Sequence, residues 1–323
     1  MGYPAVRRCV SGGFLCDILP RRTGKPMERA FLFNGIGSKP EKLLVKLPPE
    51  LMDKYEVYLD QTFKRLGLNK DIEKNKAYDG RVAEWVISLI CDRVVYEYYI
   101  EKGIIPDIGA GYSSGIVSIS GCFGAVSHDF AHDIIMMNRS TMRCLEEHDV
   151  KLDMGVVIGF SYDDASKVLE GHFSPDELII GCGNSKFHVT LSGYADAVEK
   201  ALELCQKEGA IKVFSLGTGV AYHHPIMKNY SQEYVDLCGQ DVYSDPLYPI
   251  LSIFDYRIMT TGADIMKENQ LNVYSPIRWD IALTKMEELG CREFFDDSAN
   301  GAVSKFSRLK RKCKIYTLED IYS

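Results

Sequence analysis

The sequence predicts an α/β protein with a larger unit built on a parallel sheet and a smaller α/β unit inserted into it. Two observations support this prediction. In the first part of the chain a buried strand, a long helix and a strand–turn–helix segment follow one another, as in parallel sheets with helical crossovers. Between residues 154 and 216 the expected order is strand, helix, strand, strand, helix, strand, which is the ferredoxin-like βαββαβ order.

These observations divide the chain. We expect a large domain over residues 27–152 and 217–314 and a small domain over residues 153–216. Residues 1–26 form an extension that we expect to be disordered, because it is basic, contains glycines and prolines and has no clear period. Residues 315–323 are expected to form a short tail.

The composition argues against several classes of protein. The net charge of −7 argues against nucleic acid as the main partner, and no run of 18 apolar residues is present that could span a membrane. The ten cysteines form no C-x-x-C pair and no tight framework, so we expect reduced thiols. The sequence therefore predicts a cytoplasmic globular protein that binds neither nucleic acid nor a membrane.

The first predicted strand covers residues 29–34, and a loop with two glycines follows at residues 35–38. Such a loop can hold phosphate, but the pattern G-x-G-x-x-G is absent and no Lys-Ser or Lys-Thr pair follows. We therefore expect no dinucleotide or P-loop site and no bound cofactor. A backbone N–H of the loop could still point at a neighbouring site.

Two long helices are predicted next. Apolar residues recur on one face of residues 79–102, and a second helix should begin after Ser127, a favourable N-cap residue, and run to about residue 147. His128 and His132 on the second helix have the spacing of a metal pair, but no third ligand accompanies them. We expect surface histidines and no metal site.

Between these helices, Gly111-Tyr112-Ser113-Ser114-Gly115 fits the pattern G-x-S-x-G. An apolar strand precedes it and a helix from Ser114 to Cys122 should follow, which is the context of the nucleophile elbow in α/β-hydrolase-like enzymes. The turn would present Ser113 outward, and backbone N–H groups of the new helix would face a negative charge on an attacked carbonyl. A plain Gly/Ser loop is the alternative until partner residues are found.

The small unit has six predicted elements. Strands are expected at residues 154–160, 177–182, 187–192 and 211–216, and helices at residues 163–170 and 194–208. Directly after this unit, His223 and His224 lie at the junction of the two predicted domains. An imidazole can accept a serine proton near neutral pH, so a histidine at this junction is the predicted general base for Ser113. A loop histidine without a chemical role is the alternative.

Together, the elbow, the inserted unit and the later histidine resemble the malonyl-CoA:acyl carrier protein transacylases, whose fold also serves as the acyltransferase domain of polyketide synthases. The resemblance covers residues 27 to about 310. Several loose motifs occur in the family's order, which is more specific than any one of them: Phe-Asn-Gly-Ile-Gly-Ser at 33–38, the elbow at 111–115, residues 154–159, Asn184-Ser185, residues 189–193, Tyr-His-His-Pro-Ile-Met at 222–227 and Ser-Pro-Ile-Arg-Trp at 275–279.

The resemblance implies catalytic roles by position. Ser113 would carry the acyl ester and His223 would be the base. The backbone carbonyl of Arg278 would orient the histidine. The backbone N–H groups of Ile36 and Ser114 would form the oxyanion hole.

The resemblance also implies a substrate pocket. Arg139 lies within one residue of the expected spacing on the helix after the elbow and would bind the malonyl carboxylate through two parallel hydrogen bonds. Arg143, one turn later, is the reserve candidate. Tyr112, Tyr222 and Asn184 are expected to line the pocket.

The implied reaction moves a malonyl group from malonyl-CoA to a serine ester and then to the phosphopantetheine thiol of an acyl carrier protein, in fatty acid or polyketide synthesis. We expect a monomer. Two alternatives stay open: an editing hydrolase that delivers the acyl group to water, and a non-catalytic homologue that only docks a carrier protein. Ile36 stands at the family's loop glutamine and Tyr112 at its histidine, so the acyl preference stays open.

Overall fold

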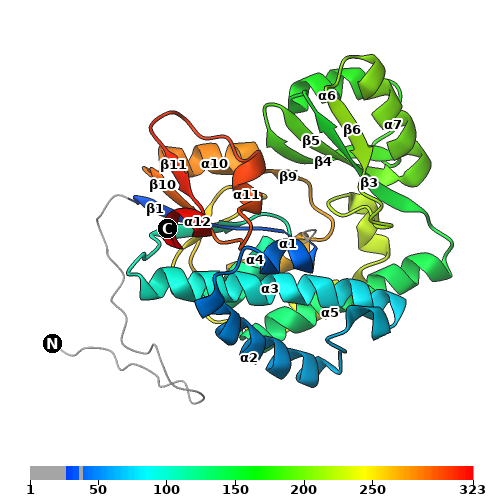
Figure 1. The fold of residues 1–323 in the computed structure, drawn as a ribbon. Coiled ribbons are helices and arrows are strands. Elements are labelled where there is room, and N and C mark those ends of the chain that lie inside the picture. Colours follow the sequence, from blue (N-terminus) through cyan, green and yellow to red (C-terminus); the bar gives the residue numbers. More distant parts are fainter. Residues whose placement is uncertain (1–26, 36–38, 323) are drawn as a thin grey trace.

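The computed structural model describes residues 27–35 and 39–322. The predicted extension at residues 1–26 and the predicted oxyanion residue Ile36 lie outside the described residues. In the described part the chain forms two sheets, a six-stranded and a five-stranded one, with helices packed on both (Figure 1).

The larger sheet has the strand order β11-β10-β1-β2-β7-β8. Neighbouring strands from β11 through β7 are parallel, and β8 pairs antiparallel with β7. The predicted parallel sheet is thus confirmed except at one edge, where it becomes mixed. The strands are β1 (Arg29–Phe33), β2 (Ile108–Gly111), β7 (Ile250–Leu251), β8 (Ile258–Met259), β10 (Glu293–Asp296) and β11 (Lys314–Tyr316).

The sequence predicted a short tail at residues 315–323, and the described residues 314–322 of this region extend the larger sheet and add a helix. β11 pairs with β10, and the ring of Tyr316 stacks on that of Phe295 with centroids 5.1 Å apart. Helix α12 (Leu318–Tyr322) follows, and Leu318 is buried. β11 has only three residues, which is too short for a period to show in the sequence.

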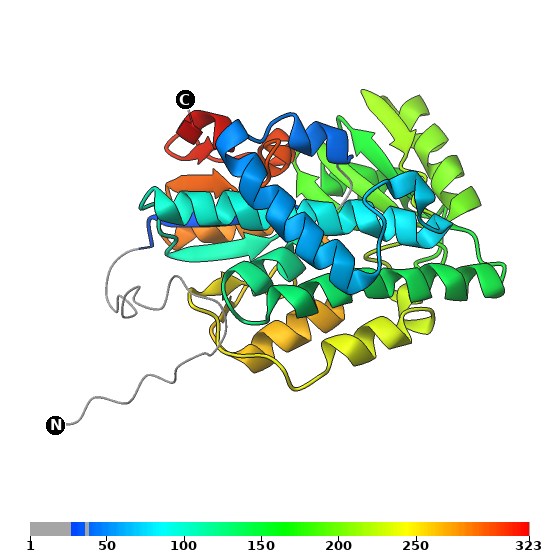
Figure 2. The ribbon, with the colours of Figure 1, turned by 60° about the horizontal axis from the view of Figure 1, so that its bottom comes forward.

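Helices cover both faces of the larger sheet because alternate residues of its strands point to opposite sides. Phe31 and Phe33 pack with one hydrophobic cluster, whereas Ala30 and Leu32 pack with another. Figure 2 shows the helices of the first face turned forward. This face carries α2 (Pro49–Leu66), α3 (Ala77–Glu101), α4 (Gly115–Cys122) and α5 (His128–Glu147), and the opposite face carries α10 (Trp279–Glu288).

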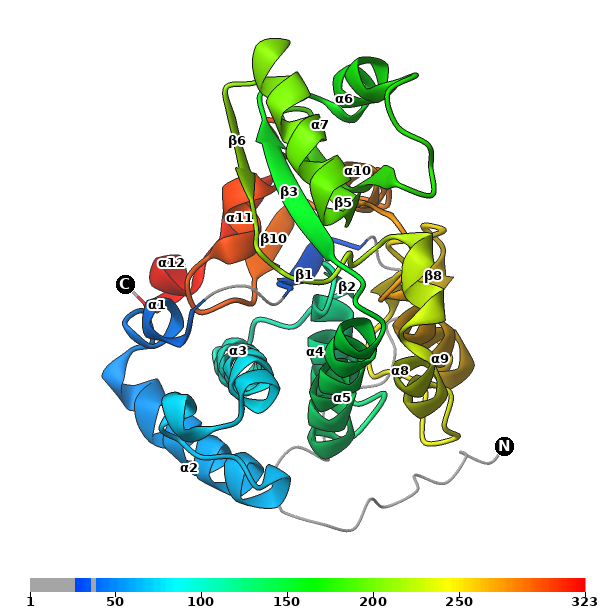
Figure 3. The same cartoon turned by 90° about the vertical axis from the view of Figure 1, so that its right-hand side faces the viewer.

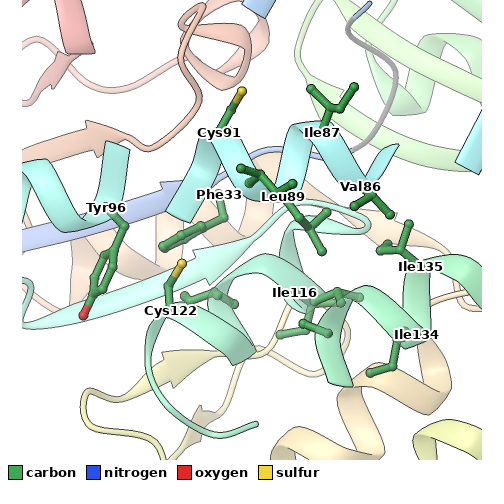
Figure 4. Close-up of a cluster of buried hydrophobic side chains, with 14 of the residues drawn as sticks. Phe33, Val86, Ile87, Leu89, Cys91, Tyr96, Ile116, Cys122, Ile134 and Ile135 are labelled. Carbon is green, nitrogen blue, oxygen red and sulfur yellow. The ribbon is translucent and has the colours of Figure 1, made fainter. Parts of the chain in front are cut away.

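The core of the first face lies where α3, α4 and α5 meet β1. Figure 4 shows Val86 and Leu89 of α3 close to Ile116 of α4 and Ile135 of α5, and all four are buried. Burial of one such side chain contributes about 1.5–3 kcal/mol to folding. The predicted helices at residues 79–102 and after Ser127 are confirmed, and the Ser127 hydroxyl accepts the predicted capping bond, from the backbone N–H of Phe130.

The remaining helices surround this core. They are the short α1 (Pro40–Leu44), the pair α8 (Gln232–Cys238) and α9 (Gly262–Leu271) beside α5 and α4, and α11 (Ala302–Phe306) after β10. Two 3₁₀ turns cover Ile72–Lys74 and Pro225–Asn229. No helix in the described ranges is long and apolar enough to cross a membrane.

The smaller sheet has the strand order β6-β3-β5-β4-β9. From β3 to β6 the elements follow the predicted order, and Figure 3 shows β3 leading from the end of α5 into this sheet. The last strand corrects the prediction, because β9 lies outside residues 153–216 and pairs parallel with β4. The elements are β3 (Leu152–Ile158), α6 (Tyr162–Leu169), β4 (Leu178–Ser185), β5 (His188–Tyr194), α7 (Ala195–Lys207), β6 (Lys212–Ser215) and β9 (Ile277–Arg278).

Candidate active site

Ser113 lies on a sharp turn between β2 and α4, with a left-handed φ of 54°. The two glycines of the pattern allow this turn. A Cβ on Gly111 would lie 2.2 Å from the backbone carbon of Gly115, and a Cβ on Gly115 would lie 2.4 Å from the carbonyl oxygen of Phe33. No side chain fits at either position, so the predicted strand–turn–helix elbow is confirmed and its glycines are explained.

His223 reaches Ser113 from the loop that follows β6. The serine Oγ lies 2.8 Å from the histidine Nε2, which is hydrogen-bond distance. The histidine has a left-handed φ of 65°, and its backbone N–H donates to the carbonyl of Val273 at 2.9 Å. The Ser192 hydroxyl donates to the carbonyl of Tyr222 at 2.7 Å and ties the loop to β5. The two predicted partners, 110 residues apart, are therefore in direct contact.

The carbonyl that faces the other ring nitrogen of His223 belongs to Ser275, not to Arg278 as predicted. The Nδ1 atom lies 3.2 Å from the Ser275 oxygen. Arg278 lies in β9, where it pairs with Gly183 of β4, and its guanidinium forms two hydrogen bonds to Asp280. The backbone of Arg278 is therefore part of the smaller sheet.

The surroundings of His223 keep its imidazole neutral. The side chain is 2% exposed, and burial lowers its pKa to about 4, against smaller opposite contributions from the backbone of Ser275 and Asn272. A neutral ring that donates from Nδ1 to the Ser275 carbonyl has its Nε2 lone pair free to accept from Ser113. The pair is thus arranged for proton transfer from serine to histidine.

A cavity of about 280 Å³ lies beside this pair. Tyr112 and Tyr222 line it, as predicted, whereas Asn184 does not. Asn184 is buried behind the wall and donates to the hydroxyl of Thr190 at 3.2 Å. The lining residues are Trp85, Tyr112, Ser113, Ser114, Ile135, Asn138, Met154, Cys182, Thr190, Leu216, Thr218, Tyr222, His223, Tyr234, Asn272 and Val273.

Tyr112 shapes the wall of the cavity. Its ring packs against Trp279 and Phe306, with centroids 5.5 and 4.8 Å away. Burial raises the pKa of its hydroxyl well above the ordinary value. The phenol therefore stays protonated at neutral pH and serves as a shape element beside the nucleophile.

Arg139 does not line the cavity, so its predicted place in the substrate pocket is wrong. Its side chain is 47% exposed and pairs with Asp79 of α3 at 3.3 Å. The preceding residue, Asn138, is buried and lines the cavity instead. Consecutive side chains on an α-helix point about 100° apart, so Asn138 can face the cavity while Arg139 faces away from it. The reserve candidate Arg143 is exposed and is not a lining residue either.

Sequence reasoning missed Asn138 although a signal was present. The predicted arginine was one residue away from the spacing that the family resemblance requires, and on a helix such an offset moves a residue to another face. Trp85 and Thr218 were also missed as lining residues. Trp85 lies far from the motifs in the sequence and Thr218 lies just before one of them, but neither is a motif residue. Only the packing of α3 and of the loop after β6 brings them to the cavity.

Two other predicted features have different outcomes. Ser114 lines the cavity at the start of α4, so its backbone N–H stays the predicted oxyanion donor. His132 is buried and His128 is half-buried, so neither is a fully exposed surface histidine, and burial lowers the pKa of both. Within residues 27–35 and 39–322 no group of three His, Cys, Asp or Glu side chains could hold a metal ion.

Comparison with curated proteins identifies relatives. The chain is 24% identical over 302 residues to the malonyl CoA-acyl carrier protein transacylase of Bacillus subtilis (strain 168), covering 90% of this chain and 93% of that protein. It is 24% identical over 273 residues to the enzyme of the same name from Haemophilus influenzae, covering 81% and 85%. No protein-family profile matches the chain. The predicted relationship is confirmed: this chain is a distant homologue of malonyl CoA-acyl carrier protein transacylases.

Solved structures share the fold. The malonyl CoA-acyl carrier protein transacylase of Coxiella burnetii superimposes with a TM-score of 0.77 at 20% identity, over 91% of this chain and 94% of that one. A malonyl-transacylase solved in complex with its type II polyketide synthase acyl-carrier protein gives 0.76 at 20% identity, over 91% and 96%. The α/β fold with mixed sheets is therefore that of these enzymes.

Proposed function

We propose that this chain is an acyltransferase of the malonyl-CoA:acyl carrier protein type. It moves the acyl group of a CoA thioester to Ser113 and from there to the phosphopantetheine thiol of an acyl carrier protein, in fatty acid or polyketide assembly. The observation that carries this proposal is the 2.8 Å contact between Ser113 and His223 at a cavity large enough for an acyl group. The names of the relatives suggest malonyl-CoA as donor and a carrier protein as acceptor.

The first half-reaction forms the acyl ester. His223 Nε2 accepts the proton of Ser113 as Oγ attacks the thioester carbonyl, and the Ser275 carbonyl steadies the imidazolium through Nδ1–H. The backbone N–H of Ser114 would face the developing oxyanion, together with that of Ile36 as the resemblance implies. When the tetrahedral intermediate collapses, the C–S bond breaks and CoA leaves with the proton from His223.

The second half-reaction runs these steps in reverse order with a new thiol. His223 accepts the proton of the phosphopantetheine thiol, whose sulfur attacks the ester carbonyl. The C–O bond to Ser113 then breaks and the serine recovers its proton from His223. The chemistry uses only side chains, backbone amides and the thioester, and needs no bound cofactor.

The lining of the cavity favours transfer to a thiol over hydrolysis. Apart from His223, the lining residues of the described chain include no carboxylate or histidine that could activate water. The thiol of Cys182 also lines the cavity, but burial raises its pKa to about 12. The acyl ester should therefore persist until a carrier thiol arrives.

The larger arrangement supports the same proposal. We infer that the six-stranded sheet with the elbow is an α/β-hydrolase-like large domain, and that residues 153–216 are an inserted ferredoxin-like domain whose sheet β9 extends. The cavity has lining residues from both: Ser113 from the first, and Met154, Cys182 and Thr190 from the second. We expect a cytoplasmic monomer, which size-exclusion chromatography with light scattering would check.

Intact-protein mass spectrometry tests the proposal. Fresh malonyl-CoA should add one acyl mass to the wild-type protein and none to Ser113→Ala. A phosphopantetheine-bearing carrier protein should remove the adduct, and the carrier without its prosthetic group should not. Absence of any adduct with every acyl-CoA would support the carrier-docking alternative, and rapid loss to water without a carrier would support the hydrolase.

A further inference from the structure

We propose that the acyl end of this cavity favours a short neutral acyl group over malonyl, so that the chain loads acetyl or butyryl groups at least as fast as malonyl. This inference rests on the proposed function and specifies the substrate class of the same site. Arg139, the residue expected to bind a carboxylate, does not line the cavity and pairs with Asp79 instead.

The described lining of the cavity offers no positive charge to a carboxylate. Among the described residues that line it there is no lysine or arginine, and His223 is the only titratable base. Its ring is buried, with a lowered pKa, so it is neutral near pH 7. Residues 36–38, which lie outside the described residues, are Ile, Gly and Ser and have no charged side chain.

Asn138 and Tyr222, two polar residues that line the cavity, are already paired with each other. Asn138 is 4% exposed, its amide donates to the carbonyl of Ile135 at 3.0 Å, and its carbonyl oxygen accepts from the Tyr222 hydroxyl at 3.0 Å. The only proton of the Tyr222 hydroxyl is thus used inside the wall. A malonyl carboxylate beside Asn138 and Tyr222 would meet neutral groups that are already hydrogen-bonded, and a buried charge without a charged partner is costly.

The apolar part of the wall suits a neutral chain. Trp85 and Tyr222 meet edge to face with ring centroids 6.3 Å apart, and Ile135, Met154 and Val273 add aliphatic surface. Each methylene buried on such a surface contributes about 0.8 kcal/mol. An acetyl or butyryl group gains this contact and leaves no charge without a partner.

One cation lies outside the cavity and next to one of its lining residues. Arg81 of α3 is exposed, and its guanidinium donates to the carbonyl of the lining residue Thr218 at 2.7 Å. To bind a substrate carboxylate inside the cavity, the Arg81 side chain would have to move from this position beside Thr218. Arg81 could therefore contradict the proposal, as could Arg139 if it left Asp79, and Arg81 is included in the test.

The test compares rates of Ser113 acylation by acetyl-, butyryl- and malonyl-CoA, measured as kcat/KM by rapid quench and intact mass. In the wild-type protein we expect acetyl or butyryl to be at least as fast as malonyl. A malonyl rate ten or more times higher would overturn this inference and leave the proposed function intact. No acylation by any of the three would remove the proposed function, and the inference with it.

Variants locate the cause. Asn138→Arg places a guanidinium in the cavity and should raise the malonyl-to-acetyl ratio by at least about tenfold, because a charged partner now faces the carboxylate. Asn138→Met, of similar length and neutral, should leave that ratio near the wild-type value. Arg81→Ala should not change the ratio, and a malonyl-specific loss in it would overturn the proposal. If Asn138→Arg does not fold, the wild-type ratio and Arg81→Ala still decide.

Discussion

The two ends of the cavity are built in different ways. At the nucleophile end, backbone geometry places the groups: Ser113 and His223 both have left-handed φ angles, and the carbonyl of Ser275 and the approach of Gly111 to Gly115 hold them. At the other end, which we call the acyl end, side chains form the wall, among them Trp85, Asn138 and Tyr222. A left-handed residue persists only where the surrounding structure determines it.

This difference separates chemistry from selectivity. A change at the nucleophile end slows or abolishes the reaction, because the backbone contacts there hold Ser113 and His223 in one conformation. A change at the acyl end replaces one side chain on a rigid helix and alters the charge that the acyl group meets. An enzyme of this kind can therefore keep its reaction while its acyl preference changes.

The largest expected effect lies at the nucleophile end. Ser113→Ala should lower the rate of acyl transfer by at least about four powers of ten, because no ester can form. His223→Ala should cost about two to four powers of ten, the usual contribution of a general base. Transfer to carrier protein measures both, and circular dichroism checks the fold. Residual transfer in Ser113→Ala above a hundredth of the wild-type rate would show that another nucleophile acts.

The packing of the elbow predicts the next effect. Gly111→Ala should lower the free energy of unfolding by about 3 kcal/mol or more, because the new Cβ would overlap the backbone of Gly115 and neither helix nor strand can yield. Gly67→Ala is the matched control, since Gly67 has a φ of 68° and open space around it. The control should lose only about 1–2 kcal/mol. Equal losses in urea unfolding would contradict the packing argument.

The pH dependence of acylation examines the burial of His223. The base acts when neutral, so lowering the pH through its folded-state pKa removes the activity. With a pKa of about 4, roughly nine-tenths of the rings are neutral at pH 5, against about 3% for an ordinary histidine. The acylation rate at pH 5 should therefore stay close to its value at pH 7. A midpoint near 6.5 in the acylation half-reaction would show that the ring is hydrated.

The smallest effect is expected from Arg139, which follows the lining residue Asn138 but does not itself line the cavity. Arg139→Ala breaks an exposed ion pair with Asp79, so stability should change by less than about 1 kcal/mol. Acylation by malonyl-CoA and by acetyl-CoA should each stay within about a factor of two, as for a surface pair. A loss confined to malonyl-CoA would mean that Arg139 leaves Asp79 and enters the cavity when substrate binds.

Local chemistry made much of the fold and of the reacting pair predictable. The G-x-S-x-G pattern requires glycines at both ends for steric reasons, and such requirements are visible in a sequence. The cap at Ser127 and the periodic helices before and after the elbow are likewise local, and the structure has them at the predicted places. A histidine partner was predictable because His223 and His224 directly follow the inserted unit, and the family resemblance selected His223.

Other features depend on contacts between distant segments. β11 pairs over three residues and β9 over two, which is too few for a periodic pattern to show in the sequence. The strand near the C-terminus and the fifth strand of the smaller sheet were therefore not predicted. The carbonyl that faces His223 comes from Ser275, 52 residues away. Arg278 is not available for this role because it lies in β9, where it pairs with Gly183 of β4. Every residue has a backbone carbonyl, so the sequence does not show which one faces the histidine.

The residue sequence therefore specifies the reaction of this protein. The nucleophile turn needs glycines around a serine, and the base needs a histidine, and these residue types in this order are rarely required by other structures. It does not specify the acyl group. Asn138 and Arg139 are adjacent in the chain, and which of them faces the substrate depends on the rotation of α5 as it packs against α3 and α4. That rotation is set by the apolar contacts of the whole helix, so only the assembled core places a neutral amide, rather than an arginine, in the cavity.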